Sequence, residues 1–386
     1  MAADKSLVSI RNCPDYADCY DSIKTALSDI SFLSLFNGKR VLLKVNLVTA
    51  RPPEEAINTH PEFVRGVIRV IQENGGIALI GESSGTLGFT KEAFEVSGIS
   101  RVALETGAKI LNFDTSGARK HIIGGKILKE AYLPDAIFDA DIKITLPKLK
   151  THDFMLLSGA LKNQMGALPG SYKCRMHQLA PTPPAMAELI SELNLYLKFD
   201  LAIVDGVISM EGNGPVFGRA KRTSFIMAGR DLVAVDAVCS AIIGFKPEVV
   251  LTNKIGEKLG LGNADLSNID LVGDTGGNRR PGSFMLPAAP SKLKVLFLGL
   301  KYFLKSIAVM PVALQNKCNA CGLCEKKCPV QAIAIDGFPR INIKRCIRCY
   351  NCFNICPNGA IRLKCKWYLK YFFKKSSRGM RLEGMV

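Results

Sequence analysis

The sequence predicts an α/β fold, a mostly parallel sheet with helices on both faces, followed by a small cysteine-rich module. Three observations lead to this prediction. Short β-branched runs alternate with longer segments of helical period through residue 290. Glycine and proline then cluster between residues 273 and 292, where the regular periodicity ends. Eight of the 13 cysteines fall between Cys318 and Cys356.

The alternation begins with a buried strand at 40–48, a helix at 61–76 that starts with proline and ends with glycine, and a strand at 77–83. The same rhythm continues in strands at 108–113, 139–148, 201–208 and 223–229 and in helices at 183–200 and 231–244. Strands that alternate with helices at these lengths predict a parallel sheet with helices on both faces. Binding sites in such sheets gather at the C-terminal ends of the strands.

We expect four segments along the chain. They are an α/β domain at 1–285, a hydrophobic linker helix at 286–314, the cysteine-rich module at 315–363 and a basic aromatic tail at 364–386. The linker contains the most hydrophobic window of the chain, but Lys301, Lys305 and Pro311 interrupt it. No apolar run approaches the roughly 18 residues that a membrane-spanning helix needs, so the linker favours an interfacial helix or a packed connection.

Two cysteine runs share one spacing. The first is Cys318-x2-Cys321-x2-Cys324-x3-Cys328-Pro, and the second is Cys346-x2-Cys349-x2-Cys352-x3-Cys356-Pro. This is the run of bacterial-type ferredoxins, in which the fourth cysteine ligates the other cluster. The spacing predicts two [4Fe-4S] clusters in an α+β ferredoxin-like module, one held by Cys318, Cys321, Cys324 and Cys356 and the other by Cys346, Cys349, Cys352 and Cys328. Structural zinc, the alternative, favours two Cys-x2-Cys pairs separated by a longer loop.

The positive charge of the chain is concentrated in its last quarter. The whole chain has a formal charge of +17, and residues 291–386 contribute +16 of it, with 19 Lys and Arg against 3 Asp and Glu. Such a surface suits a soluble electron donor or acceptor protein of acidic character or a peripheral membrane contact. Nucleic acid is disfavoured because no recognition motif accompanies the charge. Aromatic residues between the tail lysines suit a membrane interface or a helix packed against the module.

Cysteine usage indicates a reducing compartment. Metal ligation explains the clustered cysteines better than a disulfide framework, which belongs to small secreted domains. The first residues, MAADKSLVSIRN, contain no apolar core of signal-peptide length. We therefore expect a cytoplasmic protein, with membrane association left open by the basic tail.

Polar residues stand at the expected ends of several strands. Lys44 and Asn46 end the strand at 40–48, and Lys148, Lys150 and His152 follow the strand at 139–148. Lys162 and Asn163 lie in a helix or turn before Gly166, and Glu211 follows a strand that ends near Val207. In a parallel sheet these groups meet at one edge and form a positively charged site for a carboxylate or phosphate. The expected substrate-binding residues are Lys44, Asn46, Lys148, Lys150 and Asn163, and the expected catalytic residues are His152, Lys162 and Glu211.

A purely structural role is the alternative for each of these residues. A single histidine is more often a structural residue than a catalyst, and lysines on loops are usually solvated. The segment GESSGTLG (81–88) is a weak candidate for a phosphate loop because it lacks the full Rossmann or P-loop pattern.

The segments LLKVNLV, NTHPEFVRGVI, LPKLKTH, GALKNQMG, DGVISMEGNGPVFG and DLVAVDAV occur in this order before the double cysteine run. The set resembles domain-of-unknown-function family 362, whose members often carry a C-terminal ferredoxin domain. The resemblance covers about residues 40–245 and the cysteine region. It implies no particular reaction.

The residues favour an iron-sulfur oxidoreductase that passes low-potential electrons to an anionic substrate or cofactor in the α/β domain. The alternative is a non-enzymatic electron-transfer adaptor or metallocofactor assembly factor.

Overall fold

The computed structural model describes residues 5–85, 89–275, 284–287 and 309–365. Most of the predicted linker helix, the last three residues of the GESSGTLG segment and nearly all of the basic aromatic tail lie outside these residues. No helix within the described ranges is long and apolar enough to cross a membrane.

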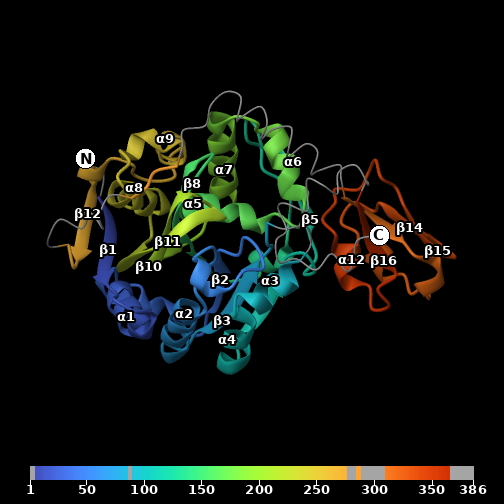
Figure 1. The fold of residues 1–386 in the computed structure, drawn as a ribbon, viewed down its shortest axis with the longest axis horizontal. Helices are drawn as coiled ribbons and strands as arrows, with labels where there is room; N and C mark the ends of the chain where they lie inside the picture. Colours follow the sequence, from blue (N-terminus) through green and yellow to red (C-terminus); the bar gives the residue numbers. More distant parts are fainter. Residues whose placement is uncertain (1–4, 86–88, 276–283, 288–308, 366–386) are drawn as a thin grey trace.

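One mixed sheet forms the centre of the α/β domain (Figure 1). Its strands lie in the order β12 (Ile269–Gly273), β1 (Ser6–Asn12), β11 (Phe217–Gly229), β10 (Leu201–Asn213), β7 (Ile142–Leu146), β2 (Arg40–Val45), β3 (Ile77–Glu82) and β4 (Lys109–Asn112). Along this path only β11 runs against its neighbours, and every other described pairing is parallel. The predicted mostly parallel sheet is therefore confirmed.

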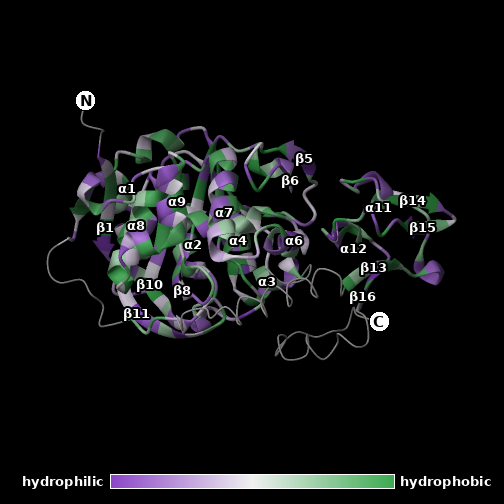
Figure 2. Cartoon of the chain, turned by 90° about the horizontal axis from the view of Figure 1, so that it is seen from above, coloured by the Kyte–Doolittle hydropathy of each residue, from purple (hydrophilic) through white to green (hydrophobic). Residues whose placement is uncertain are grey.

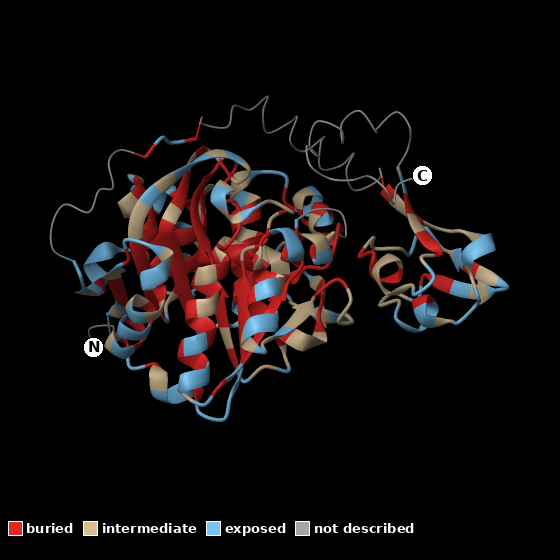
Figure 3. Ribbon diagram, turned by 60° about the horizontal axis from the view of Figure 1, so that its bottom comes forward, coloured by how far each residue is buried: buried red, intermediate tan, exposed pale blue. Residues whose placement is uncertain are grey.

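Helices cover both faces of the sheet, as predicted. One face packs against α1 (Cys19–Asp29), α2 (Pro61–Glu73), α3 (Thr90–Val96) and α4 (Ile99–Thr106). The other packs against α5 (Ala160–Asn163), α6 (Tyr172–Leu179), α7 (Pro183–Leu197), α8 (Leu232–Ile243) and α9 (Leu251–Lys258). A hydrophobic core lies on each face of the sheet, and successive strand residues point into opposite cores. Leu42 belongs to one core, and Val41 and Leu43 belong to the other. Buried strands between outer helices with exposed surfaces are visible in Figure 3.

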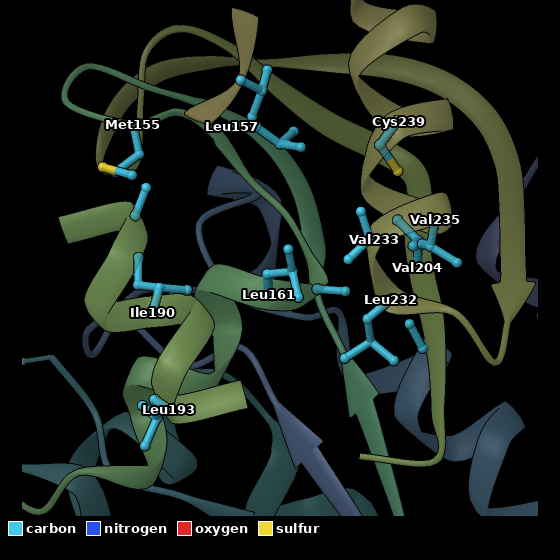
Figure 4. Close-up of a cluster of buried hydrophobic side chains, with 14 of the residues drawn as sticks. Met155, Leu157, Leu161, Ile190, Leu193, Val204, Leu232, Val233, Val235 and Cys239 are labelled. Atoms are coloured by element: carbon cyan, nitrogen blue, oxygen red, sulfur yellow. The ribbon is translucent and has the colours of Figure 1, made fainter. Parts of the chain in front are cut away.

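The short helix α5 is held inside the second of these cores. Figure 4 shows Leu161 of α5 between Ile190 and Leu193 of α7 and Val233 of α8. Burial of a leucine side chain stabilises a fold by about 1.5–3 kcal/mol, so this contact fixes the short helix against the sheet. Lys162 and Asn163, two of the predicted site residues, are positioned by this contact.

Two predicted boundaries differ from the structure. The strand expected at 201–208 continues to Asn213 and forms a long antiparallel hairpin with β11. The pairing extends beyond the predicted end, where Glu211 lies opposite Arg219. The strand expected at 139–148 ends at Leu146, and a separate strand, β8 (Lys148–His152), follows Pro147. It pairs with β10 and with β9 (Leu156–Ser158). Lys148, Lys150, His152 and Glu211 thus lie within strands and not after them.

The cysteine-rich module contains two small antiparallel pairs and two short helices. The strands are β13 (Val309–Ala313) with β16 (Ile361–Cys365) and β14 (Ile333–Asp336) with β15 (Phe338–Ile341), and the helices are α11 (Leu323–Lys326) and α12 (Asn351–Ile355). Figures 1 and 2 both place α12 between α6 of the α/β domain and the β14–β15 pair. A further antiparallel pair in the α/β domain joins β5 (Arg119–Ile122) and β6 (Glu130–Leu133).

Short 3-10 turns complete the described structure. They span Tyr16–Asp18, Leu33–Phe36, Pro53–Glu55, Asp135–Ile137, Gln164–Ala167, Pro247–Val249, Leu266–Asn268 and Gln315–Lys317.

Candidate functional site

Two of the predicted anion-binding lysines are paired with buried carboxylates. Lys44 of β2 contacts Glu82 of β3, and its Nζ also donates to the backbone oxygen of Asn163 at 2.8 Å. Nζ of Lys148 lies 2.5 Å from a carboxylate oxygen of Asp205 on β10. Burial lowers the pKa of both lysines, while the carboxylates act in the opposite direction. The charges of Lys44 and Lys148 therefore hold adjacent strands together, and their role in substrate binding stays a prediction.

The two predicted asparagines are satisfied within the protein. Asn46 donates from Nδ2 to Oδ1 of Asn163 at 3.0 Å. Asn163 donates to the hydroxyl of Thr145 at 2.9 Å and to the backbone oxygen of Lys44 at 3.2 Å. Oδ1 of Asn46 accepts a hydrogen bond of 2.6 Å from Lys150. These amides therefore position the lysines and do not point freely into a binding site.

Lys150 is buried without a carboxylate partner. Its side chain is 1% exposed, and Nζ donates to Oδ1 of Asn46 and to the backbone oxygen of Ile57, both at 2.6 Å. Within the described residues no ion pair reaches it. Burial, followed by the nearby charges of Lys162 and Lys148, holds the pKa of Lys150 well below its usual value.

His152 lies two residues further along β8 and is 6% exposed. Its Nδ1 accepts hydrogen bonds from the backbone N–H groups of Phe154 at 3.0 Å and Met155 at 3.3 Å. Oδ1 of Asp153 lies 3.5 Å from the same nitrogen, but the two amides already occupy its lone pair. The neutral ring therefore carries its proton on Nε2. Burial and the charges of Lys162 and Lys150 hold the pKa of His152 well below its usual value.

Asp236 of α8 fixes the start of α5 and so the position of Lys162. Its carboxylate accepts from the backbone N–H groups of Ala160 at 2.6 Å and Leu161 at 3.0 Å. Burial raises the pKa of Asp236 to about 7. Gly159 must lack a side chain, because a Cβ there would lie 2.1 Å from the Asp236 carboxylate.

Lys162 is the least satisfied of these cations. In the described part of the chain its ammonium group makes no hydrogen bond or ion pair, although Asp153 is near enough to raise its pKa slightly. Burial is the larger effect and lowers the pKa of Lys162 to about 8. Lys162, Lys150 and His152 interact electrostatically, and we call them the cationic cluster.

Glu211 is not brought to the cationic cluster by any contact among the described residues. Its carboxylate lies 3.0 Å from Nζ of Lys221 and accepts from the backbone N–H of Met285 at 2.9 Å. The hydrogen bonds and charges lower the pKa of Glu211 against the effect of burial. It anchors residue 285 to the hairpin, which the predicted catalytic role did not include.

A second polar group lies beside Ser83 and was not predicted from the sequence. Nζ of Lys173 donates to the backbone oxygen and hydroxyl of Ser83, both at 2.6 Å, and burial lowers the pKa of Lys173 to about 8. Asp114 accepts from the hydroxyls of Ser83 at 2.6 Å and Thr90 at 2.5 Å and from the backbone N–H of Gly170 at 2.7 Å. The only sequence signal was the serine pair of GESSGTLG, because Asp114 and Lys173 are far from it along the chain.

The structure gathers the eight cysteines of the module into two groups. Cys318, Cys321, Cys324 and Cys356 line one pocket together with apolar side chains that include Leu323, Ile335 and Ile361. Cys328, Cys346, Cys349 and Cys352 form the second group, in which burial and then the neighbouring thiols raise the pKa of Cys346, Cys349 and Cys352. Each group combines three cysteines of one run with the fourth cysteine of the other.

The chemistry of these groups fits an iron-sulfur cluster. All eight thiols are free. Backbone N–H groups donate to the sulfurs of Cys318, Cys328 and Cys356 at 3.2–3.3 Å, as suits sulfurs that carry negative charge. Among the described residues no three His, Cys, Asp or Glu side chains converge closely enough for a single metal ion.

The second cysteine group faces the α/β domain. A Cβ on Gly170 would lie 2.5 Å from the backbone oxygen of Cys349, so the two backbones touch. Ile347 packs against the larger core of the α/β domain, and the Tyr350 side chain is 1% exposed. Cys321 of the first group is exposed. The module therefore contacts the α/β domain through its second half, and we call the contact between Gly170 and Cys349 the seat of the module.

A continuous hydrogen-bonded chain leads from this seat to the cationic cluster. From Gly170 it passes through Asp114 and Ser83 to Glu82, whose carboxylate accepts from the backbone N–H of Ser83 at 3.0 Å. From Glu82 it continues through Lys44, Asn163, Asn46 and Lys150.

Comparisons with known proteins agree with the division of the chain into an α/β domain and a cysteine-rich module. Residues 41–241 match the family described as "Domain of unknown function (DUF362)", and residues 317–361 match a 4Fe-4S dicluster domain. A thylakoid-associated protein of Synechocystis sp. is 31% identical over 243 residues, which cover 62% of this chain and 74% of that protein. An uncharacterized protein of Methanocaldococcus jannaschii is 45% identical over 47 residues, 12% of this chain and 18% of that protein.

Two solved structures align with part of the chain at low similarity. The lactate racemase apoprotein from Thermoanaerobacterium thermosaccharolyticum aligns with a TM-score of 0.39 and 11% identity, over 62% of this chain and 57% of that one. A protein from Thermotoga maritima aligns with a TM-score of 0.37 and 11% identity, over 64% and 60% of the two chains. The chain spans less than two thirds of either structure.

The two matched regions coincide with the two parts of the molecule. The dicluster domain supports iron-sulfur electron transfer by the cysteine-rich module. The other match contains the cationic cluster and most of the sheet. The DUF362 match covers residues 41–241, which is more than half of the chain. The chain therefore belongs to the DUF362 family and carries a C-terminal 4Fe-4S dicluster domain.

Proposed function

We propose that this protein is an iron-sulfur oxidoreductase whose α/β domain binds an anionic substrate at the cationic cluster. The module would hold two [4Fe-4S] clusters, with Cys318, Cys321, Cys324 and Cys356 as ligands of one and Cys346, Cys349, Cys352 and Cys328 as ligands of the other. When bound, such clusters supply electrons one at a time.

The observation that carries the proposal is the uncompensated positive charge of the cationic cluster. Lys44 and Lys148 have buried carboxylate partners, whereas Lys150 and Lys162 have none within the described residues. Burying a charge is costly unless it is paired, and a bound carboxylate or phosphate would provide the missing partner. The site therefore selects small anions.

The residues of the cationic cluster have different roles in this proposal. The ammonium of Lys162 binds the anion, and Nε2–H of the neutral His152 ring donates a hydrogen bond to it. Lys150 is held by Asn46 and Ile57, so it adds a fixed donor group beside them. Asn46 and Asn163 are positioning residues.

The seat at Gly170 supports a link between the module and this site. The second cysteine group lies against the α/β domain, and the chain of hydrogen bonds starts at the same place. The first group, with exposed Cys321, is left for an external electron donor or acceptor.

The charge of the module favours an acidic partner protein. Residues 309–365 contain nine Lys and Arg and two Asp and Glu, a net charge of +7. Two oxidised clusters with their thiolates would contribute about −4, which leaves the module positive. Lys317, Lys326 and Lys327 are exposed in the first half of the module. An acidic electron-transfer protein is the partner that complements this surface.

The test is anaerobic purification followed by iron and sulfide analysis and native mass spectrometry. We expect eight irons and eight sulfides per chain, as two [4Fe-4S] clusters require. Calorimetric titration with oxalate and with inorganic phosphate should show binding that Lys162→Met abolishes while the iron content is unchanged. Neutral oxamide serves as the control ligand.

The same titration separates the proposal from a non-enzymatic adaptor or assembly factor. If neither anion binds, or if Lys162→Met and wild type bind equally, the cationic cluster is not a substrate site. An adaptor would retain its clusters and its partner binding in that case.

A further inference from the structure

Cys13 and Cys19 form a buried pair of thiols outside the cysteine-rich module. Their Sγ atoms lie 3.5 Å apart, and the two residues are 0% and 1% exposed. Both are held by the framework, because the backbone N–H of Cys13 donates to Ser224 on β11 at 2.9 Å and Cys19 is the first residue of α1. Neither cysteine has a role in the proposed function.

The connection between the two cysteines lies at the surface. Residues 14–18 join them, and Pro14, Asp15, Ala17 and Asp18 are exposed. Both sulfurs belong to the core beneath this connection, so their oxidation requires local opening. Such local opening costs much less than global unfolding. A small oxidant would reach the pair through it.

The two thiols are not equivalent. The S–H of Cys13 donates to the backbone oxygen of Asp15 at 3.2 Å, so the hydrogen bond between the sulfurs is donated by Cys19. This bond lowers the pKa of Cys13 and raises that of Cys19. Cys13 is therefore the better nucleophile, and Cys19 is placed to react second.

We propose that Cys13 and Cys19 are a redox modification site that a peroxide converts to an intramolecular disulfide. Cys13 first loses its proton, its thiolate attacks one oxygen of hydrogen peroxide, and the O–O bond breaks to leave a sulfenic acid on Cys13. The departing hydroxide takes up the proton released by Cys13 and leaves as the first water. The sulfur of Cys19 then attacks Cys13, the S–S bond forms, the S–O bond breaks, and a second water leaves. Two thiols lose two electrons and two protons, and the peroxide is reduced to two waters. A cellular dithiol reverses the change by exchange.

Tyr16 lies between the two cysteines in the sequence and connects the modification to the Lys148–Asp205 pair. The hydroxyl of Tyr16 donates to Asp205 at 3.1 Å and accepts from Lys148 at 2.8 Å, and its ring stacks on His60 with centroids 3.5 Å apart. Closing the disulfide requires the sulfurs to approach by about 1.5 Å, which shifts the turn that carries Tyr16. Oxidation therefore loosens the surroundings of the Lys148–Asp205 pair.

The first test uses the full-length holoprotein, purified anaerobically and treated with equimolar hydrogen peroxide. After denaturation and alkylation with iodoacetamide, trypsin releases residues 12–24 as one peptide that contains both cysteines. We expect this peptide to be unalkylated and about 2 Da lighter than its dithiol form, and dithiothreitol should restore two alkylation sites. Cys239, a buried thiol, should remain alkylated throughout as the control. Alkylation of both Cys13 and Cys19 after peroxide, or a sulfinic acid at Cys13, would overturn the proposal.

The second test measures amide hydrogen exchange. The backbone N–H of Ile208 donates to the Tyr16 hydroxyl at 3.3 Å, so oxidation should accelerate exchange at Ile208 at least tenfold in wild type and leave C19S unchanged. Equal exchange before and after disulfide formation would refute the link to the Lys148–Asp205 pair. Neither test depends on anion binding, so failure here is separate from failure of the proposed function.

Discussion

At the scale of single residues, the lysines near the strand ends have two different environments. Lys44 and Lys148 are paired with Glu82 and Asp205, and removal of either carboxylate would leave a buried charge at a cost of about 3–5 kcal/mol. Lys162 has no such partner in the described chain. Residues that reduce stability in the free protein are characteristic of functional sites, because their benefit appears only with the ligand bound.

Lys162→Met should therefore stabilise the free protein at pH 7. Burial lowers the pKa of Lys162 from 10.5 to about 8, so the unfolded chain binds more protons between these two values and wild-type stability rises with pH across that window. The methionine variant lacks this dependence. We expect a gain on the order of 1–2 kcal/mol at pH 7 that shrinks as the pH rises from 8 to 10.5, measured by urea unfolding. A loss of stability at pH 7 would show that Lys162 has a partner in the free protein.

The pH dependence of anion binding gives a second prediction for the same residue. Affinity for oxalate should be constant from pH 6 to about 8 and then fall by up to about tenfold per pH unit, because Lys162 loses its proton. Arginine keeps its charge at these values, so Lys162→Arg should bind oxalate with a flat profile to pH 10. Isothermal titration calorimetry at each pH provides the measurement. A profile that falls equally in both variants would assign the titration to another group.

The contacts of these residues could be predicted from the sequence only in part. The cysteine ligands follow from local spacing, since three members of each group lie within seven residues. The partners Glu82 and Asp205 could not be predicted, because strand pairing brings them to lysines that are 38 or more residues away. The position of the lysines near the strand ends could be predicted, but spacing alone does not distinguish a lysine with a carboxylate partner from one without such a partner among the described residues.

At the scale of elements, short segments position the site. α5 has only four residues, and it depends on the Asp236 cap and on Leu161 in the core. A helix of this length has little stability of its own, so tertiary contacts decide its existence. This explains why the sequence pattern located the long helices at 61–76, 183–200 and 231–244 but left residues 160–163 as a helix or turn. The β10–β11 hairpin was missed for a related reason, because its glycines read as a strand end.

The seat of the module gives a prediction at this scale. Gly170→Ala places a Cβ 2.5 Å from the backbone oxygen of Cys349, and backbone atoms cannot move aside as flexible side chains do. We expect amide exchange in Tyr350–Ile355 to accelerate at least tenfold while exchange in α8 is unchanged.

Gly124→Ala is the matched control for the seat. Gly124 also has a positive φ, +74° against +52° for Gly170, but no atom lies within 4 Å of its Cβ position. Backbone strain alone would affect the control at least as strongly as Gly170→Ala. Similar exchange in α12 for the two variants would therefore contradict the assigned contact.

At the scale of the whole molecule, charge is divided between the two parts. Residues 1–290 have 32 Lys and Arg against 31 Asp and Glu, so nearly all the excess belongs to the C-terminal quarter. Electrostatic complementarity raises association rates and makes them sensitive to salt. A basic module joined to a nearly neutral domain would direct the acidic partner that we propose to the half that carries the exposed cysteine.

This division predicts the effect of charge reversal on partner binding. Lys326→Glu with Lys327→Glu should slow association with an acidic plant-type [2Fe-2S] ferredoxin at least tenfold at 50 mM salt, and the difference should shrink at 500 mM salt. Surface plasmon resonance under anaerobic conditions measures both rates. The control is Lys254→Glu with Lys258→Glu on α9, where both lysines are also exposed. Equal slowing by the two double variants would indicate a non-specific effect of net charge.

The position of β1 in the sheet has a consequence for synthesis of the chain. β1 lies between β11 and β12, so its neighbours are residues 225–229 and 269–273. At about 5–20 residues per second, the ribosome needs roughly 10–40 seconds after β1 to make β11. During that time Cys13 has no Ser224 to hold its backbone and no sheet to cover it. A newborn chain therefore exposes this thiol pair to solvent before the fold protects it, and reducing conditions during translation should improve the yield of native protein.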